Sequence, residues 1–137
     1  MVNPTRKLEG LIRILLVDDD PRLLEVTKDL IERFGYVVTP SSSSSEAAAL
    51  ISDHHDVFDV VITDYSMPGL DGIELAMSAK KFSADIPVIL FTGGNDFIDS
   101  ERIKQAGIAG TISKPCGINE LDATIKRAIY EKAEKCL

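Results

Sequence analysis

Short blocks of apolar residues alternate along this chain with longer segments in which apolar residues recur every three or four positions. The blocks predict strands that are buried on both faces, and the spaced segments predict amphipathic helices. The predicted strands are 12–17, 36–39, 58–63, 87–92 and a fifth within 107–113. The predicted helices are 21–34, 46–53, 71–82, 97–106 and 118–132. This alternation predicts an α/β fold with one doubly wound parallel sheet.

Capping residues sharpen the limits of two of these helices. Asp20 is interpreted as the N-cap of the first helix, because Pro21 behind it suits the first helical position. Ser45 is predicted to cap the second helix. Pro40 and the serines 41–45 are then interpreted as a polar loop rather than a linker or a phosphorylation tract, because apolar elements resume at once on both sides.

The composition argues mainly against certain classes of partner. The 137 residues carry a net charge of −7, which argues against direct contact with nucleic acid or with an anionic membrane surface. The length favours one domain, predicted at 12–134, between a flexible segment 1–11 and a short tail 135–137.

Cysteine usage and the start of the chain bear on the compartment. Cys116 and Cys136 suggest free thiols in a reducing environment rather than a disulfide framework or a metal knuckle. Residues 1–11 lack the apolar core of a signal peptide, and no apolar run is long enough to span a membrane. We therefore expect a cytoplasmic protein.

Polar residues that can bind a metal or take part in a reaction follow the predicted strands at their carboxyl ends. They are Asp18, Asp19 and Asp20 after the first strand, Asp64 after the third, Thr92 at the end of the fourth and Lys114 after the fifth. Because parallel strands all end at one edge of their sheet, these side chains are expected to converge. Asp20 is interpreted as a helix cap, whereas Asp18 and Asp19 have no structural need and are interpreted as metal ligands.

The converging residue types suit phosphoryl transfer. Crowded carboxylates repel one another unless a cation neutralises them, and Mg²⁺ prefers such oxygen ligands. A metal and the ammonium of Lys114 would stabilise a phosphoryl group in transfer to Asp64, and the Thr92 hydroxyl can hydrogen-bond to it after arrival.

With these residues in place, the chain resembles the receiver domain of two-component response regulators over residues 12–132. The motifs that carry the resemblance are Val17-Asp18-Asp19-Asp20, Asp64 with Met67-Pro68-Gly69 and Asp71-Gly72, Phe91-Thr92-Gly93, and Lys114-Pro115. Each motif is weak alone, but their order and their places at strand ends make the signal strong. The resemblance implies a flavodoxin-like fold with strand order 2-1-3-4-5 and a cis peptide bond before Pro115.

The resemblance also assigns roles. It implies that Asp64 accepts the phosphoryl group from a phosphohistidine on a sensor histidine kinase or a phosphotransfer protein. The implied Mg²⁺ ligands are Asp19, Asp64 and the main-chain carbonyl of Ser66, with Asp18 acting mainly through a metal-bound water. Thr92 would be the switch hydroxyl and Lys114 the cation that pairs with the phosphate.

Three positions depart from the family's usual pattern. Thr111 stands three residues before Lys114, where family members often carry an aromatic switch residue. Gly93-Gly94 replaces an alanine and a larger residue, and Ser66 follows Asp64 by two positions. These small groups neither shield a phosphate nor position a water strongly, so the lifetime of the phosphoryl group stays open.

Three alternative functions compete with a phosphorylation-switched module, and the route of its output can also be predicted. No DNA-binding segment follows Leu137, so we expect output through protein contact on the 97–132 face. One alternative is a Mg²⁺-dependent aspartyl phosphohydrolase, which Ser66 disfavours because such an enzyme needs an acid there. Another is a degenerate receiver that only binds a partner. A flavin carrier on this fold is disfavoured because three aspartates after the first strand would repel its phosphate.

Overall fold

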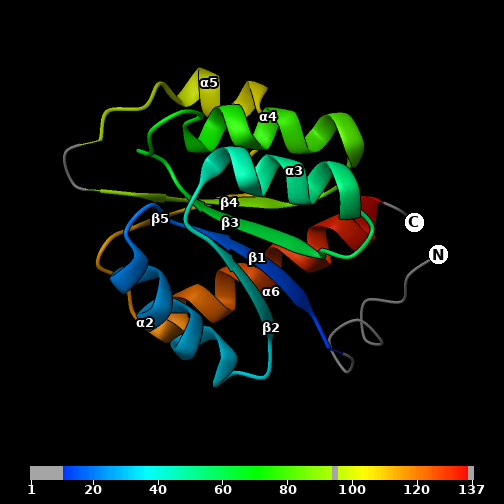
Figure 1. Cartoon of the computed structure of the whole chain (residues 1–137). Coiled ribbons are helices and arrows are strands. Elements are labelled where there is room, and N and C mark those ends of the chain that lie inside the picture. Colours follow the sequence, from blue (N-terminus) through cyan, green and yellow to red (C-terminus); the bar gives the residue numbers. More distant parts are fainter. Residues whose placement is uncertain (1–10, 94–95, 136–137) are drawn as a thin grey trace.

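The computed structural model describes residues 11–93 and 96–135, in which five strands alternate with five helices. The strands are β1 (Arg13–Val17), β2 (Val37–Ser41), β3 (Val60–Asp64), β4 (Val88–Thr92) and β5 (Gly110–Ser113). The helices are α2 (Pro21–Glu32), α3 (Ser44–His54), α4 (Gly72–Phe82), α5 (Ser100–Gln105) and α6 (Ile118–Lys135). The strands form one parallel sheet in the order β2-β1-β3-β4-β5, which confirms the predicted fold and strand order (Figure 1).

Helices cover both faces of the sheet (Figure 1). On one face, α2 and α6 pack against alternate strand residues such as Ile14 and Ile62. On the other face, α3 and α4 pack against the intervening residues, such as Leu15 and Val61. All four of these strand side chains are fully buried, which explains why the strands read as continuous apolar runs.

Two helix starts behave as their sequences indicate. Asp20 caps α2 by accepting hydrogen bonds from the backbone nitrogens of Arg22 and Leu23, and Pro21 is the first helical residue. Asp71 caps α4 in a reciprocal capping box with Glu74. The second cap places α4 directly behind the loop that follows β3.

The prediction for the serine run was wrong in its details. The strand β2 continues through Pro40 and Ser41, which were predicted to lie in a loop. The N-cap of α3 is Ser43 rather than Ser45, so the helix starts two residues earlier than predicted. The reason is tertiary: Ser44 is buried against the loop that follows β3, and this contact decides which serine ends the turn.

The helix predicted at 97–106 is also shorter than expected. The described helix α5 spans only six residues, because the Asp99 carboxylate accepts from the backbone nitrogen of Glu101 and starts the helix there. Phe97, which was counted as part of the apolar stripe, is 93% exposed and lies outside the helix. Other predicted boundaries differ from the observed ones by three residues or fewer.

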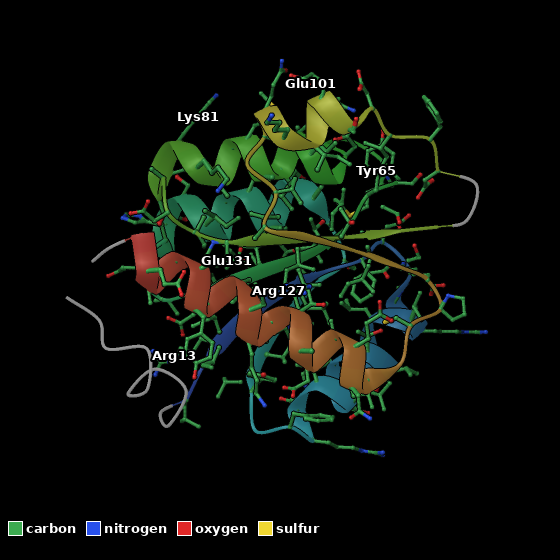
Figure 2. The ribbon with its side chains drawn as sticks, turned by 180° about the vertical axis from the view of Figure 1, so that it is seen from behind. Arg13, Tyr65, Lys81, Glu101, Arg127 and Glu131 are labelled. Carbon is green, nitrogen blue, oxygen red and sulfur yellow. The ribbon has the colours of Figure 1, made fainter. Side chains whose placement is uncertain are left out.

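The two ends of the parallel strands differ in the residues that lie there. The strands end at one edge, here called the carboxyl edge, where Asp64 and Thr92 are the last residues of β3 and β4. The start of β1 and the end of α6 lie at the opposite edge, and Figure 2 labels Arg13 and Tyr65 on opposite sides of the molecule. Within the described residues, no helix is long and apolar enough to cross a membrane. The predicted limits of the domain stay predictions, because most of the segment 1–11 lies outside the described residues.

Candidate functional site

Three carboxylates meet at the carboxyl edge. One ligand oxygen from each of Asp18, Asp19 and Asp64 lies within 4.8 Å of the other two. Asp18 and Asp19 follow β1, and Asp64 ends β3, which pairs with β1 in parallel register. A small hard cation with oxygen ligands fits this donor set. The convergence expected from the sequence is therefore present, and the cluster suits Mg²⁺.

Lys114 reaches the same cluster from the loop after β5. Its Nζ lies 3.1 Å from Asp18 Oδ2 and 3.3 Å from Asp64 Oδ1. Its backbone nitrogen donates to the carbonyl of Thr92 over 2.8 Å, and the peptide bond to Pro115 is cis, as the resemblance implied. Lys114 Nζ also lies 5.7 Å from the centre of the Phe91 ring. These contacts hold the ammonium group beside Asp64.

Asp18 and Asp19 are placed for different roles. Asp18 is buried, and its two oxygens are already used: Oδ1 accepts from the backbone nitrogen of Asp20 over 3.0 Å, and Oδ2 accepts from Lys114. Asp19 is exposed, so its carboxylate can turn freely toward a cation. The two neighbouring aspartates therefore differ in how far their oxygens are already engaged within the chain.

Charge and burial perturb two groups of the site. Burial raises the pKa of Asp64, Lys114 opposes this shift, and the negative charges of Asp18 and Asp19 add to it. For Lys114, burial alone would lower the pKa, but the hydrogen bond and charge of Asp18, with the charge of Asp64, outweigh it and raise the pKa. The ammonium group of Lys114 is therefore held in its charged form, whereas burial and the neighbouring negative charges disfavour the charged form of Asp64.

The other residues singled out in the sequence differ in exposure. Thr92 is half-buried at the end of β4. Ser66 is exposed in the loop after β3, and Thr111 is exposed on β5. Gly94, which was considered for the lifetime of the phosphoryl group, lies outside the described residues.

Sequence reasoning missed Ser44. Its Oγ donates to the carbonyl of Pro68 over 3.0 Å and accepts from the backbone nitrogen of Leu70 over 3.1 Å. This buried hydroxyl ties α3 to the loop that follows Asp64. Five consecutive serines offer no local signal that singles out Ser44, because the contact depends on a segment more than twenty positions away.

Sequence reasoning also missed Tyr65 and Arg102. Arg102 on α5 donates from Nη1 to Tyr65 Oη over 3.3 Å and from Nη2 to Asp71 Oδ2 over 3.1 Å. Tyr65 directly follows Asp64, so this contact connects α5 with the neighbourhood of the acidic cluster. No spacing rule within one element would have joined these residues.

An apolar cavity of about 420 Å³ opens beside Lys114, between α2 and the start of α6. Its walls include Leu23 and Val26 from α2 and Ile118 from α6, while Asp18 and Lys114 form its polar end. Leu23 and Val26 are exposed, so the apolar wall that α2 contributes to this cavity is open to solvent.

Comparisons with known proteins agree with this geometry. The sequence model of the family described as "Response regulator receiver domain" matches residues 14–126. The chain is 28% identical, over 90% of its length, to the two-component response regulator ARR11 of Arabidopsis thaliana. It is 33% identical, over 84% of its length, to the C4-dicarboxylate transport transcriptional regulatory protein DctD of Rhizobium meliloti. The chain spans only 24% and 25% of these two proteins.

Solved structures of similar size give the same result. A receiver domain protein from Clostridium thermocellum superposes with a TM-score of 0.84 at 32% identity, covering 90% of this chain and 98% of that one. A CheY-like receiver domain protein from Methanospirillum hungatei gives 0.83 at 31% identity, covering 92% and 99%.

Proposed function

Because this chain belongs to the response regulator receiver domain family, whose members are phosphorylation-switched modules of two-component systems, we propose that Asp64 is its phosphoacceptor. The observation that carries the proposal is the position of Lys114 Nζ, 3.3 Å from Asp64 Oδ1 inside a cluster of three carboxylates. Lys114 also contacts Asp18, but both oxygens of Asp18 already accept hydrogen bonds, so Asp64 is the carboxylate beside the lysine that we propose receives the phosphoryl group.

The proposed step is a phosphoryl transfer. The phosphorus–nitrogen bond of a phosphohistidine breaks as a bond forms between phosphorus and one oxygen of Asp64, giving an acyl phosphate. Lys114 then exchanges its contact with Asp18 or Asp64 for one with the phosphoryl oxygens, and the Thr92 hydroxyl donates a hydrogen bond to another of them. Both residues lie at strand ends beside Asp64, so neither needs a large movement.

The acidic cluster fits Mg²⁺, and we propose Asp19, Asp64 and the Ser66 carbonyl as its direct ligands. Asp18, whose oxygens are engaged by Lys114 and by the backbone of Asp20, is proposed to act through a water molecule. When bound, Mg²⁺ would offset the crowded negative charge and withdraw charge from the phosphoryl oxygens.

The phosphodonor is proposed to be a sensor histidine kinase or a phosphotransfer protein, docked over α2 and the start of α6. The exposed side chains of Leu23 and Val26 and the apolar cavity support this surface, because the cavity is lined by Lys114, whose Nζ lies 3.3 Å from Asp64 Oδ1. We propose the 97–132 face for the output partner, with no direct contact to nucleic acid or membrane. The cysteine usage favours the cytoplasm as the compartment.

The test is the intact mass of the protein after incubation with acetyl phosphate, with and without Mg²⁺. We expect one phosphoryl adduct that requires Mg²⁺ and disappears in Asp64→Asn. Asp56→Asn, which makes the same chemical change at an exposed turn, is the matched control and should retain the adduct. An adduct that persists in Asp64→Asn would contradict the assignment.

The same preparation tests whether the chain is also a phosphohydrolase. We propose that it turns over no separate substrate, since Ser66 offers no general acid two residues after Asp64. Steady release of phosphate from p-nitrophenyl phosphate that depends on Asp64 would contradict this proposal. If acetyl phosphate leaves no adduct, the protein is incubated with Mg²⁺ and beryllofluoride instead, and a structural response is measured. A chain that responds to neither would be a degenerate receiver that only binds a partner.

A further inference from the structure

The loop 65–71 leaves Asp64 and returns to its starting point. The backbone nitrogen of Gly72 donates to the carbonyl of Tyr65 over 2.8 Å, and the backbone nitrogen of Tyr65 donates to the carbonyl of Phe91 over 2.9 Å. These hydrogen bonds bring the two ends of the loop together, with Tyr65 on one side and Asp71 on the other; this base of the loop is here called the neck. Any shift of Asp64 is passed first to this neck, because Tyr65 is covalently the next residue.

Arg102 contacts both sides of the neck at once. One arm of its guanidinium donates to Tyr65 Oη, and the other donates to Asp71 Oδ2. The second oxygen of Asp71, Oδ1, caps α4 by accepting from the backbone nitrogen of Glu74 over 2.8 Å. The planar, two-armed donor geometry of arginine suits this double contact, which a lysine cannot reproduce.

The helix that carries Arg102 is short, and it is anchored mainly at one small apolar cluster. The helix α5 has six residues and none of them is buried. Its half-buried Ile103 packs with Tyr65 against a small cluster built on Ile73 and Leu90. Figure 2 labels Tyr65 close to this part of the molecule. Tyr65 therefore meets α5 in two ways, through its ring in the cluster that also holds the buried C-cap Ala106 and through its hydroxyl.

The residue that usually carries such a signal is absent from this chain. Thr111 has no ring that can move between exposed and buried positions. We propose that Arg102 is instead a positioning residue that couples Asp64 to α5 through Tyr65 and Asp71. The surface controlled in this way contains the exposed Phe97, Glu101 and Lys104, which an output partner would contact. This inference rests on the proposed function of Asp64.

The test follows the backbone amide signals of ¹⁵N-labelled protein by NMR on addition of Mg²⁺ and beryllofluoride. In the unmodified chain we expect shifts near Asp64 and in residues 103–105. Arg102→Ala should keep the shifts near Asp64 and lose at least half of those in 103–105, with Arg102→Lys between the two. Lys104→Ala, an exposed residue on the same helix, should behave like the unmodified chain.

A second readout excludes a purely structural role. Coupling between two sites is reciprocal, so loss of the α5 contact should also change the affinity for beryllofluoride, by at least two-fold. Tyr65→Phe removes only the hydroxyl and should act in the same direction as Arg102→Ala. The double variant should show less than the sum of the two effects, because both act through one contact.

The outcomes separate the two proposals. Shifts in 103–105 that stay at full size in both Arg102 variants, or an unchanged affinity, would overturn the coupling and leave the role of Asp64 intact. An unmodified chain without any response near Asp64 would overturn the proposed function, and the coupling with it.

Discussion

The replacement of Gly72 by alanine tests how tightly the phosphoacceptor loop is built. A Cβ at position 72 would lie 2.5 Å from the carbonyl oxygen of Asp64, 2.5 Å from Leu90 Cδ1 and 3.0 Å from Tyr65 Cα. An ordinary carbon–oxygen contact is about 3.3 Å or longer, so the first of these is roughly 0.8 Å too short. Two of the three clashing atoms belong to the backbone and cannot rotate away.

The expected cost follows from this geometry. Overpacking a close-packed site usually costs about 1–3 kcal/mol of folding free energy, and the backbone clashes place Gly72→Ala near the upper limit. With a urea m-value of about 2 kcal/mol per molar, a loss of about 3 kcal/mol lowers the unfolding midpoint by roughly 1.5 M. The clash also displaces the Asp64 carbonyl, so we expect slower phosphorylation by acetyl phosphate in the fraction that remains folded.

The measurement is urea unfolding followed by far-UV circular dichroism, with Gly93→Ala as the matched control. A Cβ at Gly93 would meet its nearest neighbour, Asp96 Oδ2, at 3.5 Å, which is an ordinary contact. The control should therefore stay within about 0.5 kcal/mol of the unmodified chain. Equal midpoints for both variants would refute the claim that the start of α4 is packed directly against the phosphoacceptor.

Three further predictions concern the site and its support. In EDTA, Asp64→Asn should raise the urea midpoint at pH 7 and leave it unchanged below pH 3.8. The pKa of Asp64 is raised in the folded chain, so the stability that its proton contributes is lost as the pH rises through that pKa. An uncharged asparagine avoids this loss. A variant less stable than the parent at pH 7 would contradict this. Mg²⁺ at about one hundred times its Kd should add about 2.7 kcal/mol to the free energy of unfolding. The same stabilisation in Asp19→Asn would show that the metal binds without Asp19. Ser44→Ala should cost about 1–3 kcal/mol in urea unfolding, because two backbone groups lose their buried partner, whereas exposed Ser42→Ala should be neutral; equal effects would count against the tie between α3 and the loop.

The acidic cluster could be predicted from the sequence because its geometry follows from topology. Once five strands are known to run parallel, residues that follow them must meet at one edge, and Asp19, Asp64 and Lys114 meet there. The cap at Asp20 could be predicted as well, since its contacts lie within four positions of the chain.

The misassigned segments depend on distant contacts. Any of the serines 41–45 can cap a helix, and the choice of Ser43 depends on Ser44 bonding to Pro68 across the fold. The limits of α5 were missed for a related reason, because Phe97 is apolar but faces solvent. Arg102 carried no signal at all, since its partners lie more than thirty positions away.

The separation between the two edges of the sheet bears on how such a module is reused in longer polypeptides. Both ends of the described chain, the start of β1 and the last turn of α6, emerge at the edge opposite Asp64 (Figure 1). A domain joined to either end is therefore tethered away from the phosphoacceptor and leaves it open to a donor. A domain fused at either terminus can therefore change what the module controls without altering the residues around Asp64. This chain spans about a quarter of each of the two relatives named above, so most of each relative lies outside the matched segment.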